Sequence, residues 1–172
     1  MASNHRKVVA RYRDGRLVKG YTFDFRLSQP RFHVFAEPSA RGVSTQVSLR
    51  DLKALFFVRD LVGDPARQDG QQFPPGEAGG AHVEVRFLDN EVIVGTVEGS
   101  ATDTPGFFLV PADHGSNNLR VYVLAAATRT IYPIPTFTRS TVRSPAGQRG
   151  RPATSPPDRV ILPGRLLAWL TG

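Results

Sequence analysis

Residues 7–37 read KVVARYRDGRLVKGYTFDFRLSQPRFHVFAE, and residues 82–112 read HVEVRFLDNEVIVGTVEGSATDTPGFFLVPA. The two stretches align without a gap at an offset of 75 residues. At this offset the identical pairs are Val8/Val83, Arg11/Arg86, Asp14/Asp89, Gly20/Gly95, Pro30/Pro105 and Phe32/Phe107. Similarity at a fixed offset indicates one structural unit that occurs twice. The sequence therefore predicts an internal duplication.

Each copy begins with a segment whose side chains alternate between two faces. The expected core-facing residues are Val8, Ala10 and Tyr12 in the first copy and Val83, Val85 and Phe87 in the second. A period of two is typical of a half-buried strand. Asp14-Gly15 and Asp89-Asn90 follow these segments, and such dipeptides favour tight hairpin turns with positive φ.

The rest of each copy also predicts short strands. Gly20 and Gly95 fall inside strands, where glycine permits a bend or a close backbone approach. In the first copy we expect a long bent strand over residues 17–25, a strand over 32–35, one helical turn over 48–53 and a closing strand over 54–58. The predicted fold class is all-β, with two tandem SH3-like (Sm-like) small barrels.

The chain divides into five parts by composition. Residues 6–61 and 82–135 are the two predicted barrels, and the Gly- and Pro-rich residues 62–81 are a linker between them. Residues 136–159 are rich in Pro, Ser, Thr and Arg and are expected to be disordered, because they bury too little apolar surface to order themselves. Residues 160–172 turn apolar again and form a predicted docking segment.

The formal charge of +7 is unevenly distributed along the chain. Residues 6–60 carry a balance of +7, residues 82–135 one of −3, and residues 136–172 one of +5. This asymmetry disfavours a uniformly basic nucleic-acid-binding protein. The chain contains no cysteine, which excludes disulfides, thiolate metal ligands and a cysteine nucleophile. We expect a cytoplasmic protein, because no stretch reads as a secretory signal or a membrane span.

Two resemblances to known families support the expected fold. DGRLVKG at residues 14–20, with Phe23-Asp24 after it, is similar to the first half of the Sm/LSm motif, but the family's RNA-reading Asn and Arg-Gly pair are not in place. GYTFDF, RFHVF, SLRDLKALFFVRD and PGFFLVPADHGSNNLRVYV resemble an uncharacterised bacterial family with tandem small β-barrels. That resemblance covers nearly all of residues 7–133 and implies a regulatory or signalling setting without assigning any catalytic residue.

Tyr21, Phe23 and Phe25 are expected to share one strand face in the first copy, where the second copy has Thr96, Glu98 and Ser100. With the nearby Arg26 and Arg31, they form a candidate partner-binding surface. Three interpretations stay open. The aromatic stripe is covered by the second copy or another protomer, it stacks bases of single-stranded nucleic acid, or it belongs to the core.

Two further segments contain candidate binding residues. The loop over residues 111–118 is either a structural turn or a ligand loop, with candidates Asp113, Asn117, Asn118 and Arg120. The apolar C-terminal segment either docks on a partner or folds back onto its own strand edges. Its candidate contact residues are Ile161, Leu162, Leu166, Leu167 and Trp169.

The sequence lacks the spacing of a metal site, a nucleophile elbow or a phosphate-binding glycine loop. We therefore expect no enzyme, metal or cofactor. The favoured function is a non-catalytic adaptor that acts through protein contacts, self-association included. The alternative is single-stranded nucleic-acid binding, in particular RNA, through the basic first copy and the Arg-rich tail.

Overall fold

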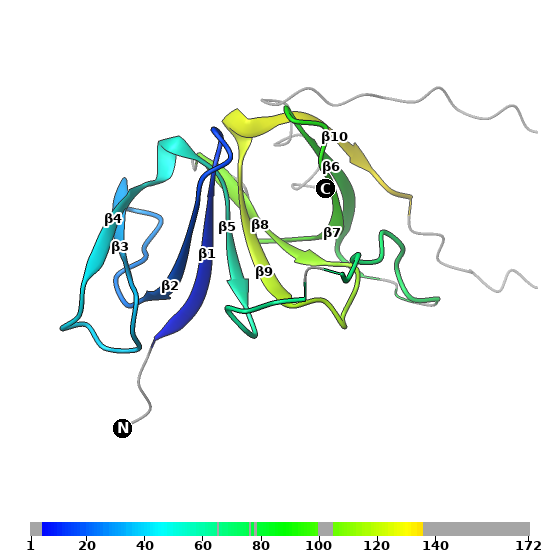
Figure 1. Ribbon diagram of the computed structural model, residues 1–172. Helices are drawn as coiled ribbons and strands as arrows, with labels where there is room; N and C mark the ends of the chain where they lie inside the picture. The colour runs from blue at the N-terminus through cyan, green and yellow to red at the C-terminus, as the bar shows by residue number, and fades with distance from the viewer. Residues whose placement is uncertain (1–4, 65, 76, 78, 100–104, 136–172) are drawn as a thin grey trace, which may run out of the picture.

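The computed structural model describes residues 5–64, 66–75, 77, 79–99 and 105–135. Within these residues the protein is all-β: ten strands form one antiparallel sheet in the order β10-β6-β7-β8-β9-β5-β1-β2-β3-β4 (Figure 1). The strands are β1 (Arg6–Tyr12), β2 (Leu17–Thr22), β3 (Arg31–Phe35), β4 (Ser44–Ser48), β5 (Leu52–Val58), β6 (Ala81–Phe87), β7 (Val92–Glu98), β8 (Gly106–Pro111), β9 (Asn118–Leu124) and β10 (Thr128–Pro133). The prediction of an all-β fold is confirmed.

The first strand of each half behaves as its sequence predicts. Val8, Ala10 and Tyr12 are buried in β1, and their counterparts Val83, Val85 and Phe87 are buried in β6. The turns that follow have the expected backbone, since Gly15 has a φ of 89° and Asn90 a φ of 67°. Asparagine and glycine adopt positive φ at low cost, which lets both hairpins close tightly.

The two halves of the sheet have the same internal order. The first half (β1–β5) is arranged β5-β1-β2-β3-β4, and the second half (β6–β10) is arranged β10-β6-β7-β8-β9. A single 3-10 turn precedes the last strand of each, η1 (Leu49–Asp51) and η2 (Ala125–Ala127). The helical turn expected in residues 48–53 is thus confirmed. No helix in the described part of the chain is long and apolar enough to cross a membrane.

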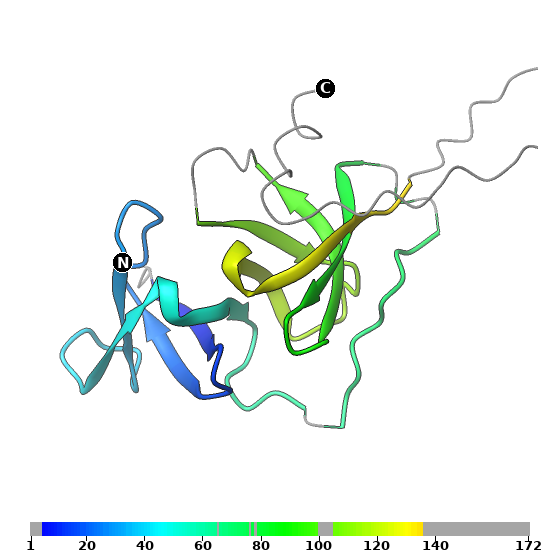
Figure 2. The ribbon, with the colours of Figure 1, turned by 90° about the horizontal axis from the view of Figure 1, so that it is seen from above.

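The halves are joined by β5 and β9, which pair antiparallel from Ala54↔Val123 to Val58↔Asn118. We call this pairing the β5–β9 joint. Every residue of β5 is buried, because β1 and β9 flank it on both edges. Figures 1 and 2 show the halves side by side, with the described residues between β5 and β6 running along the outside of the halves. The sequence did not predict that both halves would share one sheet.

The structure corrects one predicted boundary. The strand expected over residues 17–25 ends at Thr22, and β2 pairs with β3 only at Tyr21↔Phe35. Beyond Thr22 the Asp24 carboxylate accepts a hydrogen bond from the backbone N–H of His33 at 2.9 Å, so a side chain replaces the backbone carbonyl that a continued strand would offer. The first strand of the second half, β6, begins at Ala81. The predicted tail and docking segment lie outside the described residues.

Gly20 and Gly95 sit where a neighbouring strand approaches closely, as the sequence predicts. A Cβ on Gly20 would lie 2.1 Å from the carbonyl oxygen of Phe35, and one on Gly95 would lie 2.2 Å from that of Val110. Both contacts are with backbone atoms, so a side chain could be accommodated only if the strands moved apart.

Gly20→Ala should therefore lower the free energy of unfolding by about 2–3 kcal/mol through overpacking. Urea denaturation measures this change. The matched control is Gly79→Ala, because a Cβ there meets no atom within 4 Å, and it should change stability only slightly. Equal stability of the two variants would contradict the close approach at Gly20.

Candidate functional site

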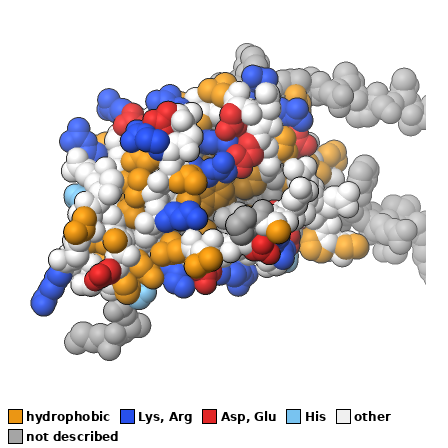
Figure 3. All heavy atoms as spheres, viewed as in Figure 1, with side chains coloured by type: hydrophobic (Ala, Val, Ile, Leu, Met, Phe, Trp, Pro, Cys, Tyr) orange, Lys and Arg blue, Asp and Glu red, His pale blue; other side chains and the backbone are white. Residues whose placement is uncertain are grey.

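The two halves enclose an open cleft of about 840 Å³ on one face of the sheet, which we call the central cleft. Its walls come from β1, β2 and β5 of the first half, β7 of the second half, and residues 60–64 and 67–71 of the segment that follows β5. Figure 3 shows apolar side chains in a hollow near the middle of the molecule, with charged side chains of both signs around it. The cleft exists because the β5–β9 joint holds the halves at a fixed spacing.

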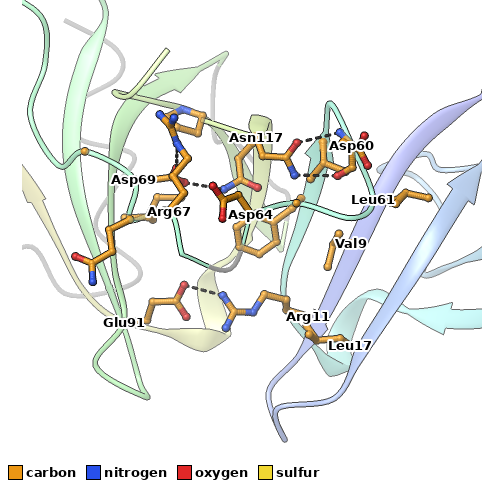
Figure 4. A pocket seen from close by; sticks show the side chains of 18 of the residues that line it. Val9, Arg11, Leu17, Asp60, Leu61, Asp64, Arg67, Asp69, Glu91 and Asn117 are labelled. Atoms are coloured by element: carbon orange, nitrogen blue, oxygen red, sulfur yellow. Dashed lines mark hydrogen bonds and ion pairs between the residues drawn. The ribbon is translucent and has the colours of Figure 1, made fainter. Parts of the chain in front are cut away.

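The walls of the central cleft combine apolar and charged groups. Val9, Leu17 and Leu61 line the side formed by the first half, with Phe56 from β5 (Figure 4). Leu17 is 51% exposed, which leaves its side chain available to a ligand in the cleft. This combination suits a ligand with apolar groups.

An ion pair spans the central cleft. Arg11 of β1 reaches the Glu91 carboxylate at 2.7 Å, and both side chains are partly exposed (Figure 4). Among the described residues, the acceptor of Lys19, on the neighbouring strand, is the carbonyl oxygen of Leu61, at 3.4 Å. The cleft therefore presents at least one cation whose charge is not cancelled by a carboxylate contact.

The linker forms one wall because it is bound to the loop before β9. The Asn117 side chain accepts from the backbone N–H of Asp60 at 2.9 Å and donates to its carbonyl oxygen at 2.8 Å (Figure 4). Ser116 and Asn118 both donate to Asp69. These contacts fix the linker against the second half.

Asp113, in the loop between β8 and β9, also binds the linker wall of the central cleft. Its carboxylate accepts from the backbone N–H groups of Gly70 and Gly115 and pairs with the Arg67 guanidinium at 2.8 Å. The hydrogen bond from Gly70, and then those from Arg67 and Gly115, place the pKa of Asp113 below its ordinary value. The predicted loop residues Asp113, Asn117 and Asn118 are thus engaged in linker contacts.

A buried cation lies near the β5–β9 joint. Lys53 is 4% exposed, and its Nζ lies 2.5 Å from oxygens of both Asp89 and Glu91, above the Phe87 ring. Burial opposes ionisation of Asp89, but hydrogen bonds from Lys53 and from the Glu91 backbone outweigh it and lower its pKa. The cluster ties the first half to the β6–β7 turn of the second half.

The predicted aromatic stripe is divided between two environments. Tyr21 and Phe23 lie near His5, with ring centroids at 5.4 and 6.1 Å. Phe25 instead packs against Phe57 and against Tyr122 of the second half, at 5.6 and 6.0 Å. The single face expected for the three residues is wrong, because the strand ends at Thr22 and the chain turns.

The other predicted site residues are not brought together. Arg26 is exposed in the middle of the β2–β3 connection, and Arg31 is exposed at the start of β3. Arg120 pairs with Glu98 and stacks on Phe108, with Cζ 3.6 Å from the ring centroid. The candidates in the C-terminal segment lie outside the described residues and are Ile161, Leu162, Leu166, Leu167 and Trp169.

Sequence reasoning missed most of the central cleft. Leu17 and Lys19 were visible as alternate residues of one strand, but nothing local showed that β7 would face them. Glu91 lies in the second hairpin, far from Arg11 in sequence. Among the described residues no group of three or more His, Cys, Asp or Glu side chains is placed to hold a metal ion. The contacts of the cleft suit binding through apolar burial and charge.

The fold and the cleft define a class of all-β protein with an internal repeat and an open cleft between its halves. The chain belongs to a family of unknown function, DUF6982, whose family model matches residues 4–132. Comparison with curated proteins gave no match. Comparison with solved structures gave none either.

The Lys53 cluster predicts a loss of stability when its carboxylates are neutralised. Asp89→Asn and Glu91→Gln together leave a buried ammonium without a charged partner. Because the two carboxylates are themselves partly exposed, we expect a loss of about 2 kcal/mol, below the range for fully buried pairs. Urea denaturation gives the value. Adding Lys53→Met to the double variant should restore most of the lost stability. If the double variant Asp89→Asn with Glu91→Gln is as stable as the parent, the role of the cluster is contradicted.

Asp113 predicts an acid-dependent contribution to stability. Its folded pKa is lowered, so the contribution is present above the ordinary aspartate value of 3.8 and is lost as pH falls through the folded pKa. Asp113→Asn should unfold at a lower urea concentration than the parent at pH 7. The difference should disappear under acid conditions well below pH 3.8. A difference that stays constant with pH would contradict a charged linker contact.

Proposed function

We propose that the chain is a non-catalytic binding protein built from two SH3-like barrels, and that its central cleft binds a segment of a partner protein. The barrel interpretation is supported by the common strand order of the halves and by the single 3-10 turn before each last strand. Both are features expected of a duplicated small barrel.

The observation that carries the proposal is the composition of the central cleft. An exposed leucine and other apolar side chains line it, and fixed charges of both signs border it. Apolar area provides affinity for a protein segment, and complementary charge selects its orientation. We expect the bound segment to place an apolar side chain beside Leu17 and a carboxylate near Lys19.

Several polar groups of the cleft are held by other parts of the chain, which favours binding over catalysis. Glu91 pairs with Arg11 and Lys53, while Asp69 accepts hydrogen bonds from Ser116 and Asn118. Groups held in this way shape a wall and orient a ligand. A regulatory setting in the cytoplasm belongs to the same proposal and rests on the resemblance to the tandem-barrel family.

The test is selection of binding peptides from a displayed random library on the full chain, followed by affinity measurement for each recovered peptide. Leu17→Arg should weaken binding by about tenfold or more, which corresponds to removing an interaction of ~1.4 kcal/mol. Isothermal titration calorimetry gives the dissociation constants. Thermal unfolding of each variant checks that the fold is retained.

The matched control is Leu88→Arg. Leu88 is 53% exposed, close to the 51% of Leu17, but it does not line the central cleft. Leu88→Arg should therefore leave peptide affinity unchanged. Failure to enrich any peptide, or an equal loss in the two variants, would refute a protein-binding role for this cleft.

A further inference from the structure

A second hollow, of about 440 Å³, lies where the start of β1 meets the end of β5 and the start of β9. We call it the basic seam. Its charged lining consists of Arg6, Lys7, Arg59 and Arg120, and it includes the side chains of Phe57 and Leu119. These cations come from three separate segments of the chain and gather only because the β5–β9 joint brings the halves together. The basic seam is separate from the central cleft, with Val58 the one residue that both linings share.

The positive charge of the basic seam is largely uncompensated. Within the part of the chain that the structure describes, no Asp or Glu lines it, and Glu98 is the carboxylate that reaches one of its cations, Arg120. Lys7 donates to the carbonyl oxygen of Arg59 at 2.9 Å. The Arg6 guanidinium lies over the Phe57 ring and is not paired with a carboxylate of any described residue. Gathered cations repel one another, and a bound anion would relieve that repulsion.

Arg59 is held in place by neutral acceptors. Its Nε donates to the carbonyl oxygen of Ser116 at 3.1 Å, and its Nη2 donates to that of His114 at 3.2 Å. These bonds fix the guanidinium without cancelling its charge. A cation fixed in this way differs from a freely solvated surface arginine, because little entropy is lost when it contacts a ligand.

Aromatic rings adjoin the same cations. Arg6 lies over Phe57 and Arg120 over Phe108, and the half-buried Phe25 and Phe108 pack on Tyr122 between them. On the β1 side His5 adjoins Tyr21. Phe57 and Tyr122 are themselves buried, so the stacking surface that the seam exposes is the guanidinium of Arg120, whose side chain is partly exposed and lies over Phe108. Bases stack on guanidinium planes as they do on aromatic rings, and basic grooves that offer such surfaces bind single-stranded nucleic acid. A phosphorylated peptide or a lipid headgroup would use the charge and leave this stacking surface without a role.

We propose that the basic seam binds single-stranded nucleic acid. Phosphates contact Arg6, Lys7 and Arg59, and a base stacks on the Arg120 guanidinium that lies over Phe108. This activity is additional to protein binding in the central cleft and does not depend on it. The site differs from the stripe expected from sequence, because Arg6, Lys7 and Arg59 play no part in that stripe.

The test is fluorescence anisotropy with a labelled single-stranded dodecauridylate and the full chain, at about 50 mM salt and above. Arg6→Gln with Lys7→Gln should raise the dissociation constant by about tenfold. It should also lower the slope of log affinity against log salt by about 1.4, because each phosphate that a cation neutralises adds ~0.7 to that slope. Both positions are at the surface, and thermal unfolding confirms that the variant is folded.

The matched control is Arg13→Gln with Arg50→Gln, which removes the same charge from two exposed arginines outside the basic seam. This control should change the dissociation constant by less than about twofold. Equal weakening by the two double variants would overturn the proposal in favour of diffuse attraction. Absence of any salt-sensitive binding would overturn it as well.

The role of the stacking surface is tested with inorganic polyphosphate, which carries the charge without bases. Phe108→Leu should weaken dodecauridylate binding severalfold and leave polyphosphate binding unchanged, because only base stacking needs the Arg120 guanidinium held over the ring. If polyphosphate binds as tightly as dodecauridylate and Phe108→Leu affects neither, the seam is an anion site and nucleic-acid binding is refuted. Leu17→Arg serves as a further control, since it alters the central cleft alone and should not affect dodecauridylate binding.

Discussion

The pairing of β5 with β9 is the constraint on which the rest of the molecule depends. Each half alone would leave an open strand edge at this position, and open edges invite pairing with other chains. Joining them covers β5 on both sides, so its run of apolar residues is buried throughout. The same pairing sets the distance between the halves. Both the central cleft and the basic seam are therefore consequences of one backbone ladder.

The joint also explains why equivalent positions of the repeat have diverged. In each half the last strand pairs with the first strand, and the pairing shifts by one residue partway along. The residue that the shift leaves without a partner position is Lys53 in β5 and Arg129 in β10. In β5 this residue lies between the halves, where it is buried and needs two carboxylates. In β10, at the edge of the sheet, Arg129 is exposed and donates to Asn90 and to the Leu88 carbonyl oxygen. One local geometry thus supports two different electrostatic roles.

The parts of the fold that were predictable from sequence are those fixed by local chemistry. The offset between copies, the alternation around Val8 and the turn residues Gly15 and Asn90 each depend on a few neighbouring positions. The β5–β9 joint could not be predicted in this way. Its continuous apolar run indicates a strand buried on both faces but does not identify the neighbouring strand. Phe25 was misplaced for a related reason, because the Asp24–His33 contacts that end the strand are themselves tertiary.

The candidate sites were harder to predict because they are assembled from residues distant in sequence. Lys7 and Arg59 carry no signal in their own segments, Arg120 is predicted as part of a different loop site, and the three come together in the basic seam only after folding. Because neighbouring residues of a strand point to opposite faces, Phe56 contributes to the central cleft and Phe57 to the basic seam. Each proposed site requires the β5–β9 joint to be intact, because its lining comes from strands on both sides of that joint. A ligand that binds only the folded arrangement at either site would therefore stabilise the joint by mass action.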